Sequence, residues 1–135
     1  MPLYLDESMI GTPGVALACA ARETLHIGDI VEAMLNQAIV AIMTNDRKLV
    51  AQISRTDNAV DRLYEAVKHY IIKLTRESLE EEDGRRAMEI MSFAINLEHI
   101  GDIIDKNLRS FPDLAGKERF AFGEQRTSCP LACIV

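Results

Sequence analysis

Apolar residues recur at helical spacing along most of the chain. The first stripe predicts a helix that starts at Thr12 and Pro13, because proline is favoured at the first helical position. Asn45 and Asp46 predict its end, and a second helix follows over residues 47–77. The first stripe comprises Leu17, Ala21, Leu25, Val31, Leu35, Ala38 and Ile42, and the second comprises Ile53, Asp57, Val60, Tyr64, Val67, Ile71 and Leu74.

A third helix is predicted between a capping signal and a proline. Residues 78–81 read Ser-Leu-Glu-Glu, which fits a capping box, and residues 80–83 place four acids in a first turn. Pro112 predicts an end near Ser110, because the residue before a proline disfavours helix. Short connections make sequential helices antiparallel. The sequence therefore predicts an all-α, elongated antiparallel three-helix bundle over residues 13–110, with a linker at 1–12 and a C-terminal tail at 111–135.

The predicted third helix is apolar on nearly all faces between residues 87 and 97. A helix at a protein surface normally shows one apolar stripe, and two neighbouring helices cannot cover every face of this one. The C-terminal tail, a second copy of the chain or a further partner could cover the remainder. We expect a homodimer. The residues concerned are Met88, Ile90, Met91, Phe93, Ala94 and Ile95.

Composition narrows the class of protein. The 135 residues carry 15 basic and 21 acidic side chains, and a net charge of -6 argues against a nucleic-acid partner. Hydrophobic residues make up 48% and aromatic residues only 5%, so the core is expected to be aliphatic. No apolar run has the length of a membrane span, and the N-terminus does not resemble a signal peptide. Three cysteines make no disulfide framework. These features favour a cytoplasmic protein.

Two stripes of carboxylates are the strongest candidates for a site. Asp57, Asp61 and Glu65 share one face of the second helix, and Glu98, Asp102 and Asp105 share one face of the third. Like charges at this spacing destabilise a helix, whereas a cation bound between them reverses the effect. Oxygen ligands suit hard cations such as magnesium, manganese, calcium or iron.

The number of acidic pairs does not distinguish a metal site from ordinary surface charge, but their positions are informative. Asp57 falls on the apolar stripe of its helix, and Glu98 and Asp102 continue the line of Met91 and Ile95. Carboxylates at the edge of a core need partners. From the residues alone two interpretations stay open: a metal site, or acids that are solvated or paired. The candidate pairing residues are Arg22, Arg55 and Arg62.

Other motifs predict little chemistry. Glu23 and His26 form a single Glu-x-x-His motif, whereas di-iron bundles need two such motifs and two further glutamates. The sequence contains no G-x-S-x-G nucleophile motif and no phosphate-binding loop motif, which argues against nucleophilic catalysis. Residues 26–30 and 99–103 are identical and read His-Ile-Gly-Asp-Ile. Glycine inside a helix costs about 1 kcal/mol relative to alanine, so Gly28 and Gly101 predict close approach of two helix backbones.

Two segments resemble motifs of one family. Residues 56–63, Thr-Asp-Asn-Ala-Val-Asp-Arg-Leu, resemble the D-x-x-x-D-x-L segment of the PhoU family, and residues 96–103, Asn-Leu-Glu-His-Ile-Gly-Asp-Ile, resemble its L-E-R-I-G-D segment. The resemblance covers about residues 15–110. Residues 2–6 and 21–25 are similar to one branch, the cytoplasmic PhoU-like domain of bacterial sodium-dependent phosphate cotransporters.

The resemblance implies a metal-binding, non-catalytic regulator of phosphate transport or phosphate signalling. By motif position, the implied metal ligands are Asp57, Asp61, Glu98 and Asp102, with iron, zinc, manganese or magnesium as the candidate metal. The implied partner is a membrane transporter domain of the same or a neighbouring chain, at the inner face of the membrane. Family members carry two three-helix repeats and this chain carries one, which supports a homodimer. His99 stands where the family motif has arginine.

Overall fold

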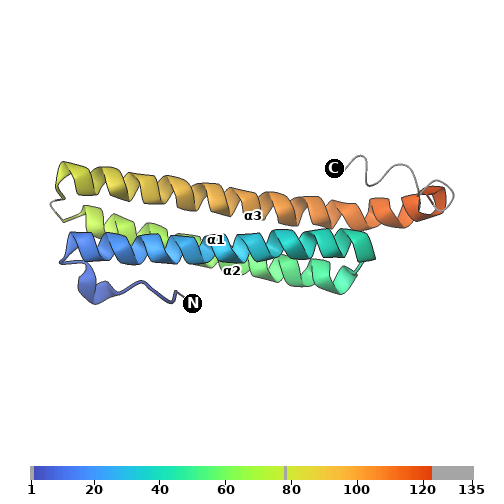
Figure 1. Ribbon diagram of the computed structural model, residues 1–135, viewed down its shortest axis with the longest axis horizontal. Helices are drawn as coiled ribbons and strands as arrows, with labels where there is room; N and C mark the ends of the chain where they lie inside the picture. The colour runs from blue at the N-terminus through green and yellow to red at the C-terminus, as the bar shows by residue number, and fades with distance from the viewer. Residues whose placement is uncertain (1, 78, 123–135) are drawn as a thin grey trace.

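A computed structural model describes residues 2–77 and 79–122, with only the backbone helix described for residues 111–122. Its elements are a 3₁₀ turn η1 (Glu7–Met9) and three helices, α1 (Pro13–Thr44), α2 (Arg47–Thr75) and α3 (Glu81–Phe122). The described residues contain no strand. Helices α1 and α3 run in the same direction, and α2 runs in the opposite one (Figure 1). The predicted all-α three-helix bundle is confirmed.

Two adjacent residues reverse the chain between α1 and α2. Asn45 adopts a left-handed conformation with φ 52° at the C-cap of α1. Asparagine tolerates this conformation better than most other residues do. Asp46 is the N-cap of α2, where its side chain accepts hydrogen bonds from the backbone nitrogens of Lys48 (3.0 Å) and Leu49 (3.2 Å). The predicted break at Asn45 and Asp46, and the predicted start of α1 at Pro13, are confirmed.

The predicted end of the third helix near Ser110 is wrong, because α3 continues through Pro112 to Phe122. It extends past the ends of α1 and α2 (Figure 1). Proline removes one backbone donor and costs about 3 kcal/mol inside a helix, which biases a helix to end but does not force it to. At the other end, α3 begins at Glu81 with three acids in its first turn. The predicted capping residue Ser78, and residues 123–135 of the predicted tail, lie outside the described residues.

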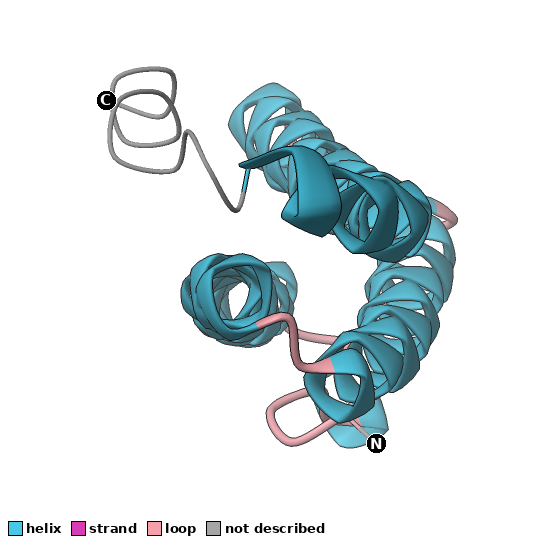
Figure 2. Cartoon of the chain, turned by 90° about the vertical axis from the view of Figure 1, so that its right-hand side faces the viewer, coloured by secondary structure: helices cyan, strands magenta, loops and turns pink. Residues whose placement is uncertain are grey.

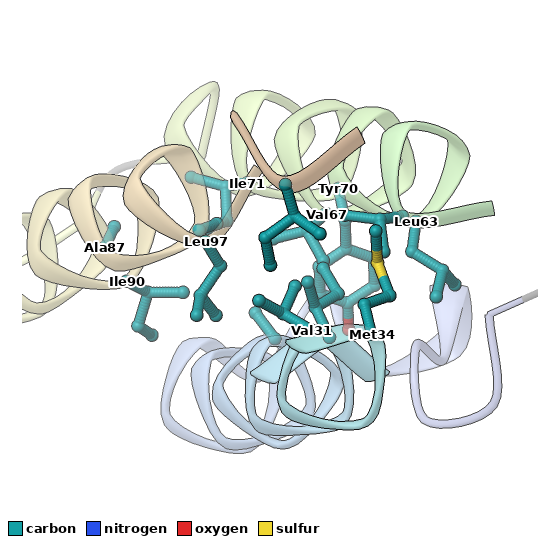
Figure 3. Close-up of a cluster of buried hydrophobic side chains, with 14 of the residues drawn as sticks. Val31, Met34, Leu63, Val67, Tyr70, Ile71, Ala87, Ile90 and Leu97 are labelled. Carbon is teal, nitrogen blue, oxygen red and sulfur yellow. The ribbon is translucent and has the colours of Figure 1, made fainter. Parts of the chain in front are cut away.

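The core is mainly aliphatic and takes side chains from all three helices, which Figure 2 shows nearly end-on. Each pair of helices is in contact. The largest side chains that are fully buried include Leu17, Ile27 and Met34 of α1 and Ile53 and Leu74 of α2. Side chains from all three helices converge in Figure 3, where the labelled residues are Val31, Met34, Leu63, Val67, Tyr70, Ile71, Ala87, Ile90 and Leu97.

Large apolar side chains also remain exposed, most of them on α1 and α3 and one, Ile72, on α2. On α3 they include Met88 and Phe93, as the sequence predicts for this helix. On α1 they include Leu25, which the sequence places on the predicted core stripe, and Met43, for which the sequence makes no prediction. The length and composition of α1 also meet the criteria for a helix that crosses a membrane. The core helices of soluble proteins meet the same criteria. The exposed set on α1 and α3 is Val15, Leu25, Leu35, Ile39, Val40 and Met43 of α1, and Met88, Phe93, Ile100 and Ile103 of α3.

Candidate functional site

Carboxylates of α2 and α3 gather where these two helices pack together. Asp57 lies on the buried stripe of α2 between Ile53 and Val60, and only 3% of its surface is exposed. Asp105 of α3 is 5% exposed. Asp61, Glu98 and Asp102 are partly exposed. We call these five acids the carboxylate cluster: Asp57, Asp61, Glu98, Asp102 and Asp105. Each of the other four lies close enough for its charge to raise the pKa of Asp57, so the four acids that the sequence selects lie near one another.

Gly101 makes room for the Asp57 carboxylate. A Cβ atom at position 101 would lie 2.9 Å from Oδ1 of Asp57, a distance that real Cβ atoms essentially never show. At the matching position of the short repeat, a Cβ atom on Gly28 would lie 3.7 Å from the nearest side-chain atom of Leu97, which is ordinary contact. The sequence predicted close approach of helix backbones at both glycines. At Gly101 the tight neighbour is instead a carboxylate side chain, and at Gly28 the space is much looser.

This difference predicts opposite results for two identical substitutions. Gly28→Ala is expected to stabilise the protein by about 0.5–1 kcal/mol, because alanine favours the helix and fits the available space. Gly101→Ala is expected to destabilise it by about 1–2 kcal/mol, because the buried Asp57 side chain has to move. Urea unfolding of both variants beside the wild type measures the two changes. Equal stabilisation by both would show that Gly101 has no such role.

The cluster carries unfavourable charge. Burial raises the pKa of Asp57 to about 6, and the charges of Asp61, Asp105, Asp102 and Glu98 add to the rise. Burial also raises the pKa of Asp61, and so do the charge and the hydrogen bond of Glu98. Oδ1 of Asp57 and Oδ1 of Asp61 are buried and have no hydrogen-bond partner within the described part of the chain. Buried acceptors without partners are rare in native proteins, so these two atoms require an explanation.

Two cations pair with the cluster, both on α3 itself. Nζ of Lys106 lies 2.9 Å from Oδ2 of Asp102, and this contact raises the pKa of Lys106. A guanidinium nitrogen of Arg109 lies 2.7 Å from Oδ2 of Asp105. The hydroxyl of Ser54 on α2 also donates a hydrogen bond to Asp105. Within the described ranges, no ion pair reaches Asp57 or Asp61.

The arginines proposed from the sequence as pairing residues do not fill that role. Among the ion pairs of the described residues, none involves Arg22, Arg55 or Arg62. The guanidinium of Arg22 instead lies 4.7 Å from the ring centre of Tyr4. Residues four apart on one helix lie one turn above the other, so this spacing favours ion pairs within a single helix. The pairing cations come from Lys106 and Arg109, which are four residues after their acids.

Several other predicted contributors fall outside the cluster, and one residue joins it. Glu65 is exposed and lies beside Lys68 and His69. The side chain of His99 is 64% exposed, with Nε2 3.7 Å from Oε2 of Glu98. Asp105 belongs to the cluster although it lies after the motif of residues 96–103. Its position on the same carboxylate stripe, three residues after Asp102, indicated this from the sequence.

The Glu-x-x-His motif serves a different purpose from metal binding. Glu23 is fully buried, and its Oε1 accepts hydrogen bonds from the backbone nitrogens of Leu3 (2.7 Å) and Tyr4 (2.9 Å). The ring of His26 meets the ring of Tyr4 edge-on. Within residues 2–77 and 79–110, no three Asp, Glu, His or Cys side chains are already arranged to hold one metal ion. Cys129 and Cys133 lie outside the described residues, and Cys19 is a half-buried free thiol.

The fold and the cluster define a class of protein: a three-helix bundle with opposed carboxylates buried between two of its helices. Residues 24–109 match the PhoU domain, and the chain therefore belongs to the PhoU family.

Known relatives are named for phosphate transport. The chain is 36% identical over 121 residues to YjbB of Escherichia coli K12, which is named for inorganic phosphate export; the match covers 90% of this chain and 22% of YjbB. The YjbB of Salmonella typhimurium is 36% identical over 124 residues, covering 92% and 23%. The phosphate-specific transport system accessory protein PhoU of Serratia marcescens is 26% identical over 109 residues, covering 80% and 45%.

The chain spans less than a quarter of the length of the YjbB relatives and less than half of that of PhoU. No solved structure gave a significant match.

Proposed function

We propose that this chain is a non-catalytic regulatory domain in phosphate transport or phosphate signalling, and that it binds a metal cation through Asp57, Asp61, Glu98 and Asp102. Its membership of the PhoU family and the names of its relatives support the phosphate connection. The observation that carries the metal proposal is the pair of buried carboxylate oxygens without partners, one on Asp57 and one on Asp61.

The residues fit a hard cation in number, charge and chemistry. Five carboxylates share the space between α2 and α3, and their two cationic neighbours pair only with Asp102 and Asp105. A divalent or trivalent cation would supply the missing positive charge and accept the two unpaired oxygens. Because no three ligands are already in place, the partly exposed side chains would turn toward the ion. Iron, zinc, manganese and magnesium are the candidate cations.

A cation at this place would affect how two helices pack. Asp57 and Asp61 belong to α2, whereas Glu98 and Asp102 belong to α3, so a shared ion holds these helices together. Without the ion, mutual repulsion of the acids opposes the same packing. Metal binding or loss would thereby shift the bundle between two arrangements, which is the physical basis of a regulatory switch.

We further propose a location at the cytoplasmic face of the membrane, next to a transporter domain. The support is the similarity of residues 2–6 and 21–25 to the PhoU-like domain of sodium-dependent phosphate cotransporters, together with the much greater length of the YjbB relatives. In this setting the bundle would gate or sense phosphate movement without catalysing a reaction.

Phosphate movement in cells tests the regulatory role. In the native organism, Asp57→Asn/Asp61→Asn is expected to change the rate of radiolabelled phosphate uptake or release several-fold, because the switch loses its cation. Glu65→Gln is the matched control, since this acid lies on the same helix but outside the cluster. Phosphate rates that stay equal in all three strains would contradict the proposal.

A second candidate function is a dimerising bundle without a metal, and the exposed apolar residues of α1 and α3 favour the dimer itself. Exposed apolar residues that form a continuous patch mark interaction surfaces in other proteins. We propose a homodimer formed through these two helices. Analytical ultracentrifugation at micromolar concentration is expected to give twice the chain mass of 15.1 kDa, and Phe93→Ser/Ile100→Ser is expected to halve it. A wild-type monomer would contradict the dimer.

A further inference from the structure

The N-terminal segment folds back along the bundle and is held at several points (Figure 1). Glu23 of α1 accepts the two backbone hydrogen bonds of Leu3 and Tyr4. On α2, the hydroxyl of Tyr70 donates a hydrogen bond to the backbone oxygen of Asp6 at 2.8 Å. Nζ of Lys73 lies 3.1 Å from Oε1 of Glu7. Residues 2–10, which we call the strap, therefore connect α1 and α2 from outside the core.

Glu23 depends on the strap for its hydrogen bonds. Its side chain is fully buried, Oε1 accepts both backbone hydrogens of the strap, and Oε2 has no partner among the described residues. A buried carboxylate without hydrogen bonds is strongly unfavourable, so loss of the strap would expose Glu23 to water or force it to move. The carboxylate is thus a specific anchor for a backbone segment, and the strap covers it.

The strap is held by polar and ring contacts and buries little apolar surface. Leu3 is 63% exposed, and η1 contains no buried residue. Only Leu5 and Ile10 pack partly against the core. Segments with few buried apolar contacts open at low free-energy cost, so this segment can detach while the three helices stay folded.

We propose that the strap is a releasable element whose docking reports the position of α2 relative to α1. Its anchors lie on two helices, Glu23 on α1 and Tyr70 on α2, so docking requires that these helices keep their spacing. Asp57 and Asp61 lie on the same continuous helix as Tyr70. A cation shared with α3 would draw α2 toward α3, change the spacing of the anchors and release the strap. This trigger rests on the proposed metal site, whereas the docking rests on the contacts above.

Amide hydrogen exchange in the full chain, measured by NMR, tests both parts. In the metal-free wild type, the Leu3 and Tyr4 amides are expected to exchange at least tenfold more slowly than in Glu23→Ala. Tyr70→Phe, which removes only a hydroxyl, is expected to weaken the protection without unfolding the core. Glu32→Gln, a change at an exposed acid of α1, is the control and is expected to leave the exchange unchanged. Rapid exchange in the wild type, or protection that survives both anchor variants, would overturn the strap.

Addition of Zn²⁺ tests the trigger. The Leu3 and Tyr4 amides of the wild type are expected to exchange at least threefold faster with Zn²⁺, and those of Asp57→Asn/Asp61→Asn are expected not to respond. Bound zinc, measured on the same sample, separates the two ways of failing. Bound zinc with unchanged exchange would overturn release by the cation and leave the proposed metal function standing. A wild type that binds no zinc, manganese, iron or magnesium would overturn the metal function and the trigger together.

Discussion

Asp57→Asn is expected to stabilise the metal-free protein by about 2–3 kcal/mol at pH 8, because burial and four neighbouring acids raise the pKa of this group from 3.8 to about 6. The folded state therefore holds a proton that the unfolded state releases between these two pH values. The stability of the metal-free wild type is expected to fall as the pH rises from about 4 to about 6 and to stay low above it. Asparagine keeps the shape of the side chain, removes the charge and supplies donors to the acids around it.

Urea unfolding at pH 4, 6 and 8 in the presence of a chelator measures this effect. The other charged groups at the cluster are Asp61, Glu98, Asp102 and Asp105 with Lys106 and Arg109. Burial and the neighbouring Glu98 also raise the pKa of Asp61. The raised pKa of Asp61 also makes the folded state less stable as the pH rises, as that of Asp57 does. Asp29→Asn, at an exposed acid of α1, is the control and is expected to leave the slope unchanged. A wild type that gains stability between pH 4 and pH 6 would contradict the charge repulsion.

Metal is expected to offset the repulsion of the acids in the wild type, but not in a variant that lacks two of them. A cation present at about 100 times its dissociation constant stabilises the folded state by about 2.7 kcal/mol, provided that it binds only that state. The wild type is expected to show this gain at pH 7, whereas Asp57→Asn/Glu98→Gln is expected to show almost none. Thermal unfolding with zinc, manganese, iron or magnesium, each compared with the chelated protein, measures the difference. Equal gains in wild type and variant would indicate binding elsewhere.

Local signals along the chain predicted the helix boundaries well wherever neighbouring residues determine the structure. Asn45 and Asp46 form a C-cap and an N-cap side by side, and the periodicity that placed Asp57 on an apolar stripe was enough to predict its burial. The continuation of α3 past Pro112 was not predictable in this way, because a proline sets a local bias that the rest of a long helix can outweigh.

The sequence did not predict roles that depend on contacts between residues far apart in the chain. Glu23 belongs to a Glu-x-x-His motif that is typical of metal sites. Its hydrogen-bond partners are instead the backbone nitrogens of Leu3 and Tyr4, about twenty residues earlier, and a pattern of side chains does not reveal such partners. Asp105 was placed on the carboxylate stripe of the third helix but not among the four implied ligands, because the motif ends before it; its hydrogen bond from Ser54 of α2 was not predictable from the stripe. The approach of Gly101 to Asp57 shows the opposite case, since a glycine inside a helix already indicated a tight contact but not its chemical identity.

Metal content tests the central claim most directly. Wild type and Asp57→Asn/Glu98→Gln would be purified without chelator and without a metal-affinity tag, and each would be analysed for its elements. We predict at least one equivalent of iron, zinc, manganese or magnesium per wild-type chain and its loss in the variant. A wild-type protein without bound metal, which also takes up none when each of these ions is supplied, would contradict the account and would leave the carboxylate cluster as a purely electrostatic feature of the bundle.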